Sequence, residues 1–203
     1  MFFDKRQIRH FSNFLTVDQI SCLLNHACNS KTENATVGKI INGKYTTEYQ
    51  EWCTADFVIY AEFESLIIDL SKLIENKIKE TYLIECIDNP EIHFLKYKSG
   101  AFYKSHIDGQ YIDGNKARRG TDRDLTAVFY LNDDYKGGEV YFDFFNLKIK
   151  PKQNDLLIYP TTLQYRHSVS KVEGNRYAIV FWYTTNPALN IDCVIPDSVL
   201  KSL

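Results

Sequence analysis

The stretch RHSVSKVEGNRYAIVFWY, residues 166–183, is the clearest indication of fold class in the chain. It belongs to two expected strands, at 165–169 and 177–184, with a turn at Gly174 between them. Side chains in a strand point alternately to its two faces. One face would therefore carry Arg176, Ala178, Val180 and Trp182, and the other Tyr177, Ile179, Phe181 and Tyr183. Trp182 is thus expected on the same side of a sheet as Arg176.

The pattern of short strands and turn residues extends back to about residue 90. Further strands are expected at 92–97, 125–132, 139–143, 147–150 and 155–159. They are punctuated by turn residues, namely Gly137-Gly138, Pro151 and Pro160. The high content of aromatic residues, with 14 Tyr and 13 Phe, also favours strands.

The first 90 residues carry helical patterns instead. One helix is expected to begin near Thr16, because Thr16 and Gln19 have the spacing of a capping box. A second should cover 61–80, with one apolar stripe formed by Leu66, Ile67, Leu70, Leu73, Ile74 and Ile78. Between them, Asn42-Gly43 predicts a hairpin turn. Helices followed by many strands favour an α+β fold, with the sheet closed or doubled into a barrel or jelly roll and the helices packed outside.

Composition sets limits on the class of protein. The 203 residues suit one domain, and 44% hydrophobic with 25% charged residues is typical of a soluble globular chain. The formal net charge of -2 offers no basic surface for nucleic acid. The five Cys form no C-x-x-C pair, and no run approaches the ~20 apolar residues of a membrane span. The N-terminus has charges where a signal peptide needs an apolar run, so we expect a cytoplasmic protein that meets neither nucleic acid nor membrane.

A candidate metal site begins at His106-Ile107-Asp108. On an extended segment, residues i and i+2 point the same way, so both side chains can bind one metal ion. His167 is the candidate third ligand. Two His and one carboxylate form the facial triad of non-haem iron(II) oxygenases, which leaves three coordination positions free for a bidentate 2-oxo acid and dioxygen.

Each of these residues also has a simpler interpretation. An H-x-D pair alone is a weak signal, since Asp108 can lie in a surface turn and accept a backbone hydrogen bond. His167 can be a partly buried strand residue, and Arg176 a solvated residue at a strand end. The functional interpretation of Arg176 is different. A co-substrate carboxylate buried inside a barrel needs a cation in the barrel wall, and the planar fork of Arg suits this role.

A set of ordered motifs favours the metal-site interpretation. YKSGAFYKSHID (residues 97–108) resembles the Tyr-x-x-Gly-x-x-Tyr-x-x-His-x-Asp motif of the prolyl 4-hydroxylase-like 2-oxoglutarate/Fe(II)-dependent dioxygenases. LTAVFYLND (125–133), GGEVYF (137–142), IKPKQNDLLIYP (149–160) and the opening stretch resemble later segments of that family, in the same order. The resemblance covers roughly residues 90–185.

The resemblance implies a double-stranded β-helix (jelly-roll or cupin-like) core and a set of roles. His106, Asp108 and His167 would bind Fe(II), and Arg176 the distal carboxylate of 2-oxoglutarate. Tyr130 would assist at that carboxylate, and Tyr97 would line the co-substrate pocket, with Trp182 beside it. Tyr103 matches the motif without an assigned role. The cofactors implied are Fe(II), 2-oxoglutarate and O2, with ascorbate as a further candidate.

The expected organisation is one dioxygenase domain over residues 1–203, with 1–90 as helical support and possible substrate lid and 91–185 as catalytic β core. The expected reaction is hydroxylation of a substrate C–H, in the first instance a prolyl residue in a protein or peptide, with release of succinate and CO2. The same chemistry on a free amino acid, another side chain or a small metabolite stays open. A non-catalytic β-helix binding module is a third possibility, although all three ligands and the basic anchor are present. The polar loop with Arg118, Arg119 and Arg123 is either a cover for the substrate or a solvated loop, and His10, His26 and His93 are expected to be structural or surface residues.

Overall fold

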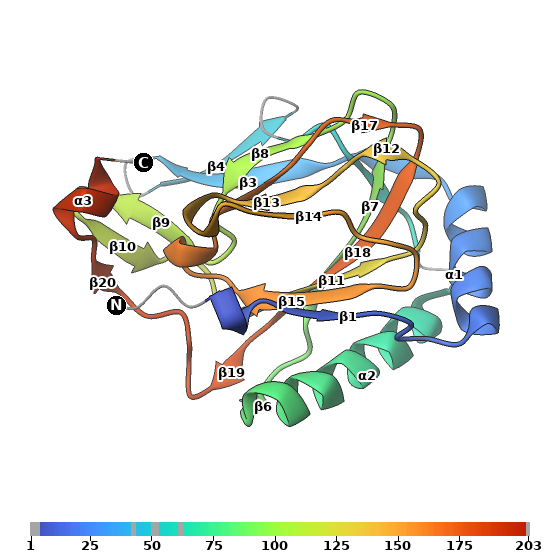
Figure 1. Ribbon diagram of the computed structural model, residues 1–203, viewed down its shortest axis with the longest axis horizontal. Coiled ribbons are helices and arrows are strands. Elements are labelled where there is room, and N and C mark those ends of the chain that lie inside the picture. Colours follow the sequence, from blue (N-terminus) through green and yellow to red (C-terminus); the bar gives the residue numbers. More distant parts are fainter. Residues whose placement is uncertain (1–4, 42–43, 50–52, 61–62, 202–203) are drawn as a thin grey trace.

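The computed structural model describes residues 5–41, 44–49, 53–60 and 63–201 (Figure 1). Its centre is a seven-stranded antiparallel sheet. The strand order is β1 (Arg9–Phe11), β15 (Leu156–Pro160), β11 (Leu125–Tyr130), β18 (Arg176–Tyr183), β7 (Glu91–Tyr97), β5 (Asp56–Val58) and β2 (Thr32–Asn34). This sheet supplies one wall of the candidate site.

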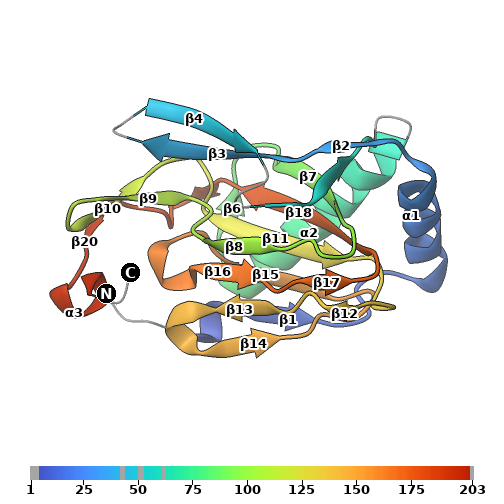
Figure 2. The ribbon, with the colours of Figure 1, turned by 90° about the horizontal axis from the view of Figure 1, so that it is seen from above.

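A four-stranded antiparallel sheet supplies the other wall (Figure 2). Its order is β14 (Leu147–Ile149), β13 (Val140–Phe142), β16 (His167–Val169) and β8 (Tyr103–His106). Side chains from both sheets meet in one buried cluster, which includes Val128, Val180, Phe142 and Val169. The sheet is therefore doubled rather than closed, as a jelly roll requires, and the predicted α+β double-stranded β-helix is confirmed.

Smaller pairings complete the strands. β9 (Gln110–Asp113), β10 (Lys116–Arg119) and β20 (Cys193–Val194) form a three-stranded sheet. Two-stranded pairs join β12 (Lys136–Gly137) to β17 (Val172–Glu173), β19 (Thr185–Asn186) to β6 (Glu85–Cys86), and β3 (Thr36–Ile41) to β4 (Lys44–Tyr49). The β3–β4 register confirms the predicted hairpin, whose turn residues 42–43 lie outside the described residues.

The N-terminal helices cover the outer face of the large sheet, as predicted (Figure 1). α1 (Val17–Asn29) begins at the expected capping box: Gln19 N donates to Thr16 Oγ1 at 3.3 Å, and Thr16 N donates to Gln19 Oε1 at 3.0 Å. A short α3 (Asp197–Leu200) follows β20. Among the described residues, no helix is long and apolar enough to cross a membrane.

α2 (Glu64–Tyr82) has a narrower buried stripe than predicted. Ile67, Leu70, Ile74 and Ile78 are buried against the sheet, but Leu66 and Leu73 are 36% and 43% exposed. Including these two in the stripe was wrong, because they lie at the margin of the face that the sheet covers. The sequence pattern alone does not fix how wide that covered face is.

β18 confirms the predicted alternation of side chains. Tyr177, Ile179, Phe181 and Tyr183 pack in the core under the helices, whereas Ala178 and Val180 pack between the two sheets. Several predicted strand boundaries were wrong by one or two residues, among them the start of β16. Residues Leu163–Tyr165 form a 3-10 turn, so β16 begins at His167 rather than at 165.

Candidate metal centre

The three predicted ligands meet where β8 and β16 pair. His106 is the last residue of β8, Asp108 follows it by two residues, and His167 is the first residue of β16. The strand register sets His167 opposite His106. Ligand atoms of the three side chains all lie within 4.8 Å of one another. Sheet pairing therefore supplies the third group that a local motif lacks.

Both imidazoles are held by backbone carbonyls two residues earlier in the chain. His106 Nδ1 lies 2.8 Å from Lys104 O, and His167 Nδ1 lies 3.0 Å from Tyr165 O. A carbonyl oxygen has no proton to give, so each Nδ1 must be the donor. In a neutral ring of this tautomer the lone pair lies on Nε2, the atom through which each imidazole can bind a metal ion.

The Asp108 carboxylate lies between the two rings. Its Oδ1 is 3.2 Å from His106 Nε2 and its Oδ2 is 4.0 Å from His167 Nε2. Thr126 Oγ1 donates to Oδ2 at 2.6 Å. Burial alone would raise the pKa of Asp108, but His167, His106 and the Thr126 hydroxyl outweigh it and hold the pKa well below its usual range. The carboxylate is therefore ionised at neutral pH.

His167 is neutral at the same pH. Burial and then the neighbouring His106 lower its pKa to about 4, against the opposing pull of Asp108. Tyr159 Oη lies 3.0 Å from His167 Nε2 and must donate to it, because Nδ1 carries the ring proton. Two imidazole nitrogens and an ionised carboxylate thus lie within 4.8 Å of one another, so the donor set fits a divalent iron ion.

Arg176 opens into the same cavity from the facing sheet. It is only 2% exposed. Its guanidinium lies over the rings of Tyr97, at 4.6 Å, and Tyr130, at 5.0 Å. Its Nε and the Tyr130 hydroxyl have no hydrogen-bond partner, and no carboxylate among the described residues pairs with the guanidinium. A buried charge without a partner is costly, so this part of the cavity is complementary to a ligand carboxylate.

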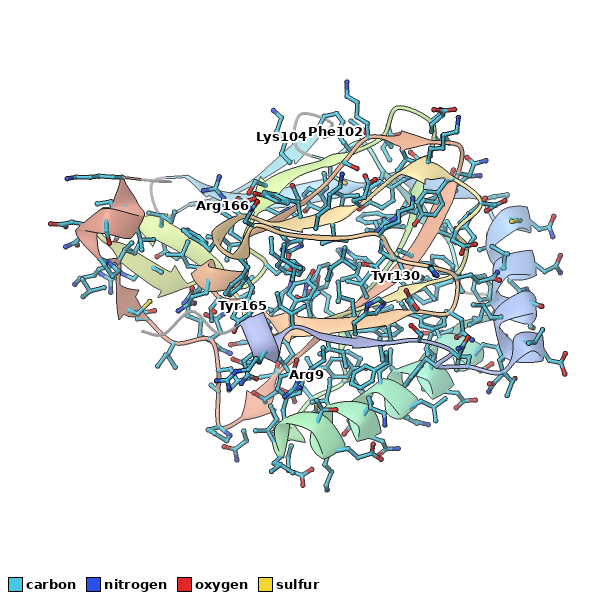
Figure 3. All side chains as sticks on the ribbon, in the orientation of Figure 1. Arg9, Phe102, Lys104, Tyr130, Tyr165 and Arg166 are labelled. Atoms are coloured by element: carbon cyan, nitrogen blue, oxygen red, sulfur yellow. The ribbon has the colours of Figure 1, made fainter. Side chains whose placement is uncertain are left out.

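The remaining predicted pocket residues also line this cavity, which lies between the two sheets. Tyr97, Tyr130 and Trp182 all contribute to its wall. Figure 3 shows Tyr130 among the side chains that fill the space between the sheets. The structure thus brings together all seven side chains singled out from the sequence, namely His106, Asp108, His167, Arg176, Tyr97, Tyr130 and Trp182.

Sequence reasoning missed three residues of the site and gave a fourth, Tyr103, no role. Tyr103 stacks on His106, with ring centroids 3.7 Å apart. Thr126 and Tyr159 hydrogen-bond the ligands, and His93 lines the cavity although it was expected to be structural or at the surface. Strand alternation could have found two of them, since Thr126 shares a face with Tyr130, and His93 with Tyr97. The other two histidines are structural: His10 pairs with Asp155 at 2.7 Å, and His26 stacks on Phe63.

The arginines of the polar loop have separate places. Arg118 pairs with Asp113 and Asp192, and Arg119 with the buried Asp124, so both stabilise the β9–β10 region. Arg123 instead lies over the Trp182 ring at 3.9 Å and pairs with Glu91 at 2.5 Å. Arg123 is thus the one of these three that contacts a residue of the cavity wall.

Comparisons with known proteins agree with this geometry. Residues 92–184 match the 2OG-Fe(II) oxygenase superfamily. A PKHD-type hydroxylase from Prochlorococcus marinus is 35% identical over 126 residues, which cover 58% of this chain and 53% of that protein. Human prolyl 3-hydroxylase 2 is 36% identical over 90 residues, or 41% of this chain and 13% of that protein. The chain thus spans about half the length of the first of these relatives and much less of the second.

Solved structures show the same fold over most of the chain. A Trichoplax adhaerens prolyl hydroxylase, solved with a peptide fragment of the hypoxia inducible factor oxygen degradation domain, superposes with a TM-score of 0.70 at 19% identity and covers 91% of this chain and 86% of its own. A Pseudomonas putida prolyl-4-hydroxylase gives 0.65 at 18% identity, with 88% and 92% covered. Residues 92–184 thus match the 2OG-Fe(II) oxygenase superfamily, and the chain has the fold of these two prolyl hydroxylases.

Proposed function

We propose that this protein is an Fe(II)- and 2-oxoglutarate-dependent dioxygenase that hydroxylates a prolyl residue in a protein or peptide and releases succinate and CO2. The observation that carries the proposal is the pairing of two features in one cavity. These are a His-Asp-His donor set and a buried guanidinium that has no carboxylate partner among the described residues. A 2-oxo diacid has one end for each of them: its 2-oxo acid group chelates a metal, and its distal carboxylate requires a cation.

Each residue has a definite part in this proposal. His106, Asp108 and His167 hold Fe(II), which supplies the redox chemistry that activates dioxygen. Arg176 binds the distal carboxylate through its planar fork, and the unpartnered Tyr130 hydroxyl donates to the same group. Tyr97 and Trp182 are walls of the pocket that exclude water. The neutral His167 and ionised Asp108 need lose no proton before they bind metal at pH 7.

The prolyl substrate is supported by the kind of relatives that the chain has. The Prochlorococcus protein is named a hydroxylase, and the human and Trichoplax proteins prolyl hydroxylases. The same centre could act on a free amino acid, another side chain or a metabolite. We also propose that residues 1–90 support the core and form a lid, and that residues 91–185 are the catalytic core. The use of ascorbate, a cytoplasmic location and the lack of contact with nucleic acid are proposals too.

The first test is the visible charge-transfer band of an Fe(II)–2-oxoglutarate chelate under anaerobic conditions. The wild type should develop the band. His106→Ala should abolish it, because one of three metal ligands is removed. Arg176→Ala should need much more 2-oxoglutarate to reach it, because the distal carboxylate loses its cation. A folded, metal-loaded wild type without the band would contradict the proposal.

The second test concerns the substrate. Peptides with a single proline and free amino acids are incubated aerobically with the loaded enzyme, and products are searched for a mass increase of one oxygen atom, with succinate measured in parallel. The proposal predicts the oxygen on the proline of a peptide. Modification of free amino acids alone would keep the reaction class and replace the substrate.

A further inference from the structure

A groove of about 410 Å³ opens beside the metal cavity. The two share part of their wall, because Phe57 and His93 line both of them. These two rings are in edge contact, with centroids 4.8 Å apart. His93 in turn contacts Trp182, also at 4.8 Å. A molecule that lies in the groove would therefore reach the rim of the candidate active site without crossing another structural element.

Among the described residues, the edge of β7 that faces this groove is only partly covered by a partner strand. β18 pairs with β7 along its whole length, from Glu91 to Tyr97. On the other edge, β5 pairs only with Leu95 and Lys96. The chain then leaves β7, since Val58 pairs with Thr32 and Ile59 N donates to Lys31 O at 2.9 Å.

Among the strands of the described residues, none pairs with this edge of β7 from Glu91 to Phe94. The groove occupies the place that a continued β5 would fill, with Ile92, His93 and Phe94 in its wall. An unpaired edge offers backbone N–H and C=O groups to an extended peptide, which can add to the sheet as another strand.

The groove also carries an uncompensated negative charge. Glu33 of β2 and Glu64 in the first turn of α2 line it. In the part of the chain that the structure describes, neither carboxylate has a cationic partner within 4.0 Å. By contrast, Glu91 at the start of β7 is already paired with Arg123. The apolar part of the lining includes Ile59, which is 42% exposed.

We propose that this groove binds an extended segment of the peptide substrate as an added strand along β7, with a Lys or Arg side chain of that segment between Glu33 and Glu64. The unpaired edge supplies hydrogen bonds to the peptide backbone, and the two carboxylates select the cationic side chain. Because Phe57 and His93 line both the groove and the metal cavity, a peptide in the groove would extend into that cavity. The inference rests on the proposed function, because it names the class of peptide that the site takes.

The test for charge uses fluorescent peptides with one central proline and either Lys or Glu placed at each other position in turn. Anisotropy is measured anaerobically with protein loaded with Mn(II) and 2-oxoglutarate. At one or two positions the Lys peptide should bind at least about fivefold more tightly than its Glu counterpart. Glu33→Lys combined with Glu64→Lys should reverse this order. Glu80→Lys combined with Glu173→Lys changes the net charge equally at exposed sites outside the groove and should leave the order intact.

The test for strand addition uses N-methylated forms of the best Lys peptide. An added strand directs alternate N–H groups toward β7. Methylation at one set of alternate residues should weaken binding about tenfold, and methylation at the other set should have little effect. Equal effects in both sets would overturn strand addition. The Glu33→Gln, Glu64→Gln pair, with its thermal midpoint measured, controls for folding.

The outcomes separate this inference from the proposed function. A wild type that forms the charge-transfer band and hydroxylates Lys and Glu peptides equally well overturns the groove and leaves the reaction standing. The opposite outcome is a protein that never forms the band but binds Lys peptides selectively, with the selectivity abolished by the Glu33 and Glu64 changes. That outcome would support peptide binding in the groove and contradict the proposed reaction.

Discussion

At the scale of single residues, the orientation of the Asp108 carboxylate depends on one hydroxyl. Thr126 is 1% exposed and donates to Asp108 Oδ2 at 2.6 Å from the facing sheet. A hydrogen bond of this kind fixes which oxygen of the carboxylate stays free for a metal. Partners that hold a ligand in this way typically account for about 10–100-fold in metal affinity.

Thr126→Val should therefore weaken Mn(II) binding by about 10–100-fold, since valine keeps the shape and lacks the hydroxyl. Mn(II) titration followed by electron paramagnetic resonance measures this directly. Thr126→Ser retains a hydroxyl and should bind Mn(II) close to the wild-type affinity. A valine variant within about threefold of the wild type would mean that the strand alone holds Asp108.

Arg176 has opposite effects on stability and on binding. In the absence of a ligand its buried guanidinium has no carboxylate partner among the described residues. Replacing such a charge with an apolar side chain of similar length is often neutral or stabilising by about 1–4 kcal/mol. Arg176→Met should thus be at least as stable as the wild type in urea unfolding without ligand.

The same variant should lose its response to 2-oxoglutarate. In the presence of Mn(II), the co-substrate should raise the thermal midpoint of the wild type, because it binds only the folded state. It should not raise that of Arg176→Met. If the variant unfolds more easily without ligand, the stacking of Arg176 on Tyr97 and Tyr130 outweighs the cost of its burial.

At the scale of elements, Asp124 joins β10 and β11 to the segment after β18. Its carboxylate is fully buried and accepts backbone N–H groups of Thr185, Leu189 and Asn190 at 2.7–2.9 Å. Arg119 Nη1 donates to the same carboxylate at 2.9 Å. Four donors on one buried carboxylate fix the path of the chain that leads to β20.

Asp124→Asn should lower the free energy of unfolding by about 2–4 kcal/mol, because it removes a charge and turns one acceptor into a donor facing Thr185 N. Asp122→Asn is the matched control: Asp122 also pairs with Arg119, but its side chain is 89% exposed. The control should cost less than about 0.5 kcal/mol. Urea unfolding at pH 7 compares the two.

Asp124 also predicts how stability depends on pH. Burial alone would raise its pKa, but Arg119 and the amides of Thr185 and Asn190 hold the pKa below its ordinary value. The unfolded chain then binds the proton first, at about pH 3.9. The stabilisation is present above that pH and is lost as the pH falls below it. Urea unfolding between pH 3 and 5 should show a shallower decline for Asp124→Asn; equal slopes would contradict this assignment.

At the scale of the whole molecule, the proposed metal ion and 2-oxoglutarate together connect the two sheets. The histidines belong to β8 and β16 of the small sheet, and Arg176 belongs to β18 of the large one. A metal alone would contact the small sheet and the adjoining Asp108. A chelated diacid would also contact Arg176, so it should stabilise both sheets together.

Amide hydrogen exchange can detect this difference. Mn(II) alone should slow exchange mainly in β8 and β16, whereas Mn(II) with 2-oxoglutarate should extend the protection to β18 and its neighbour β11. Succinate, which lacks the 2-oxo group, should give much weaker protection. Identical patterns with and without 2-oxoglutarate would mean that the co-substrate does not reach Arg176.

The sequence by itself determined those features that depend on local periodicity or on rare residue types. The alternation of β18 follows from side-chain direction in any strand, and the start of α1 from the side chains of Thr16 and Gln19. The three side chains that meet at the candidate metal centre could be predicted because only five His are present and His106 has a carboxylate two residues away. These signals need no knowledge of the partner strand.

The tertiary structure alone decided which distant groups meet. Strand pairing sets His167 opposite His106, brings Thr126 to Asp108 and leaves part of one β7 edge without a partner among the described strands. Short strands such as β2 and β5 were not predicted, because three residues show no periodicity and are ordered by their neighbours. The physical reason is common to all of these: a sheet is held by hydrogen bonds between segments far apart in the chain, so its register and its free edges depend on contacts that no local stretch contains.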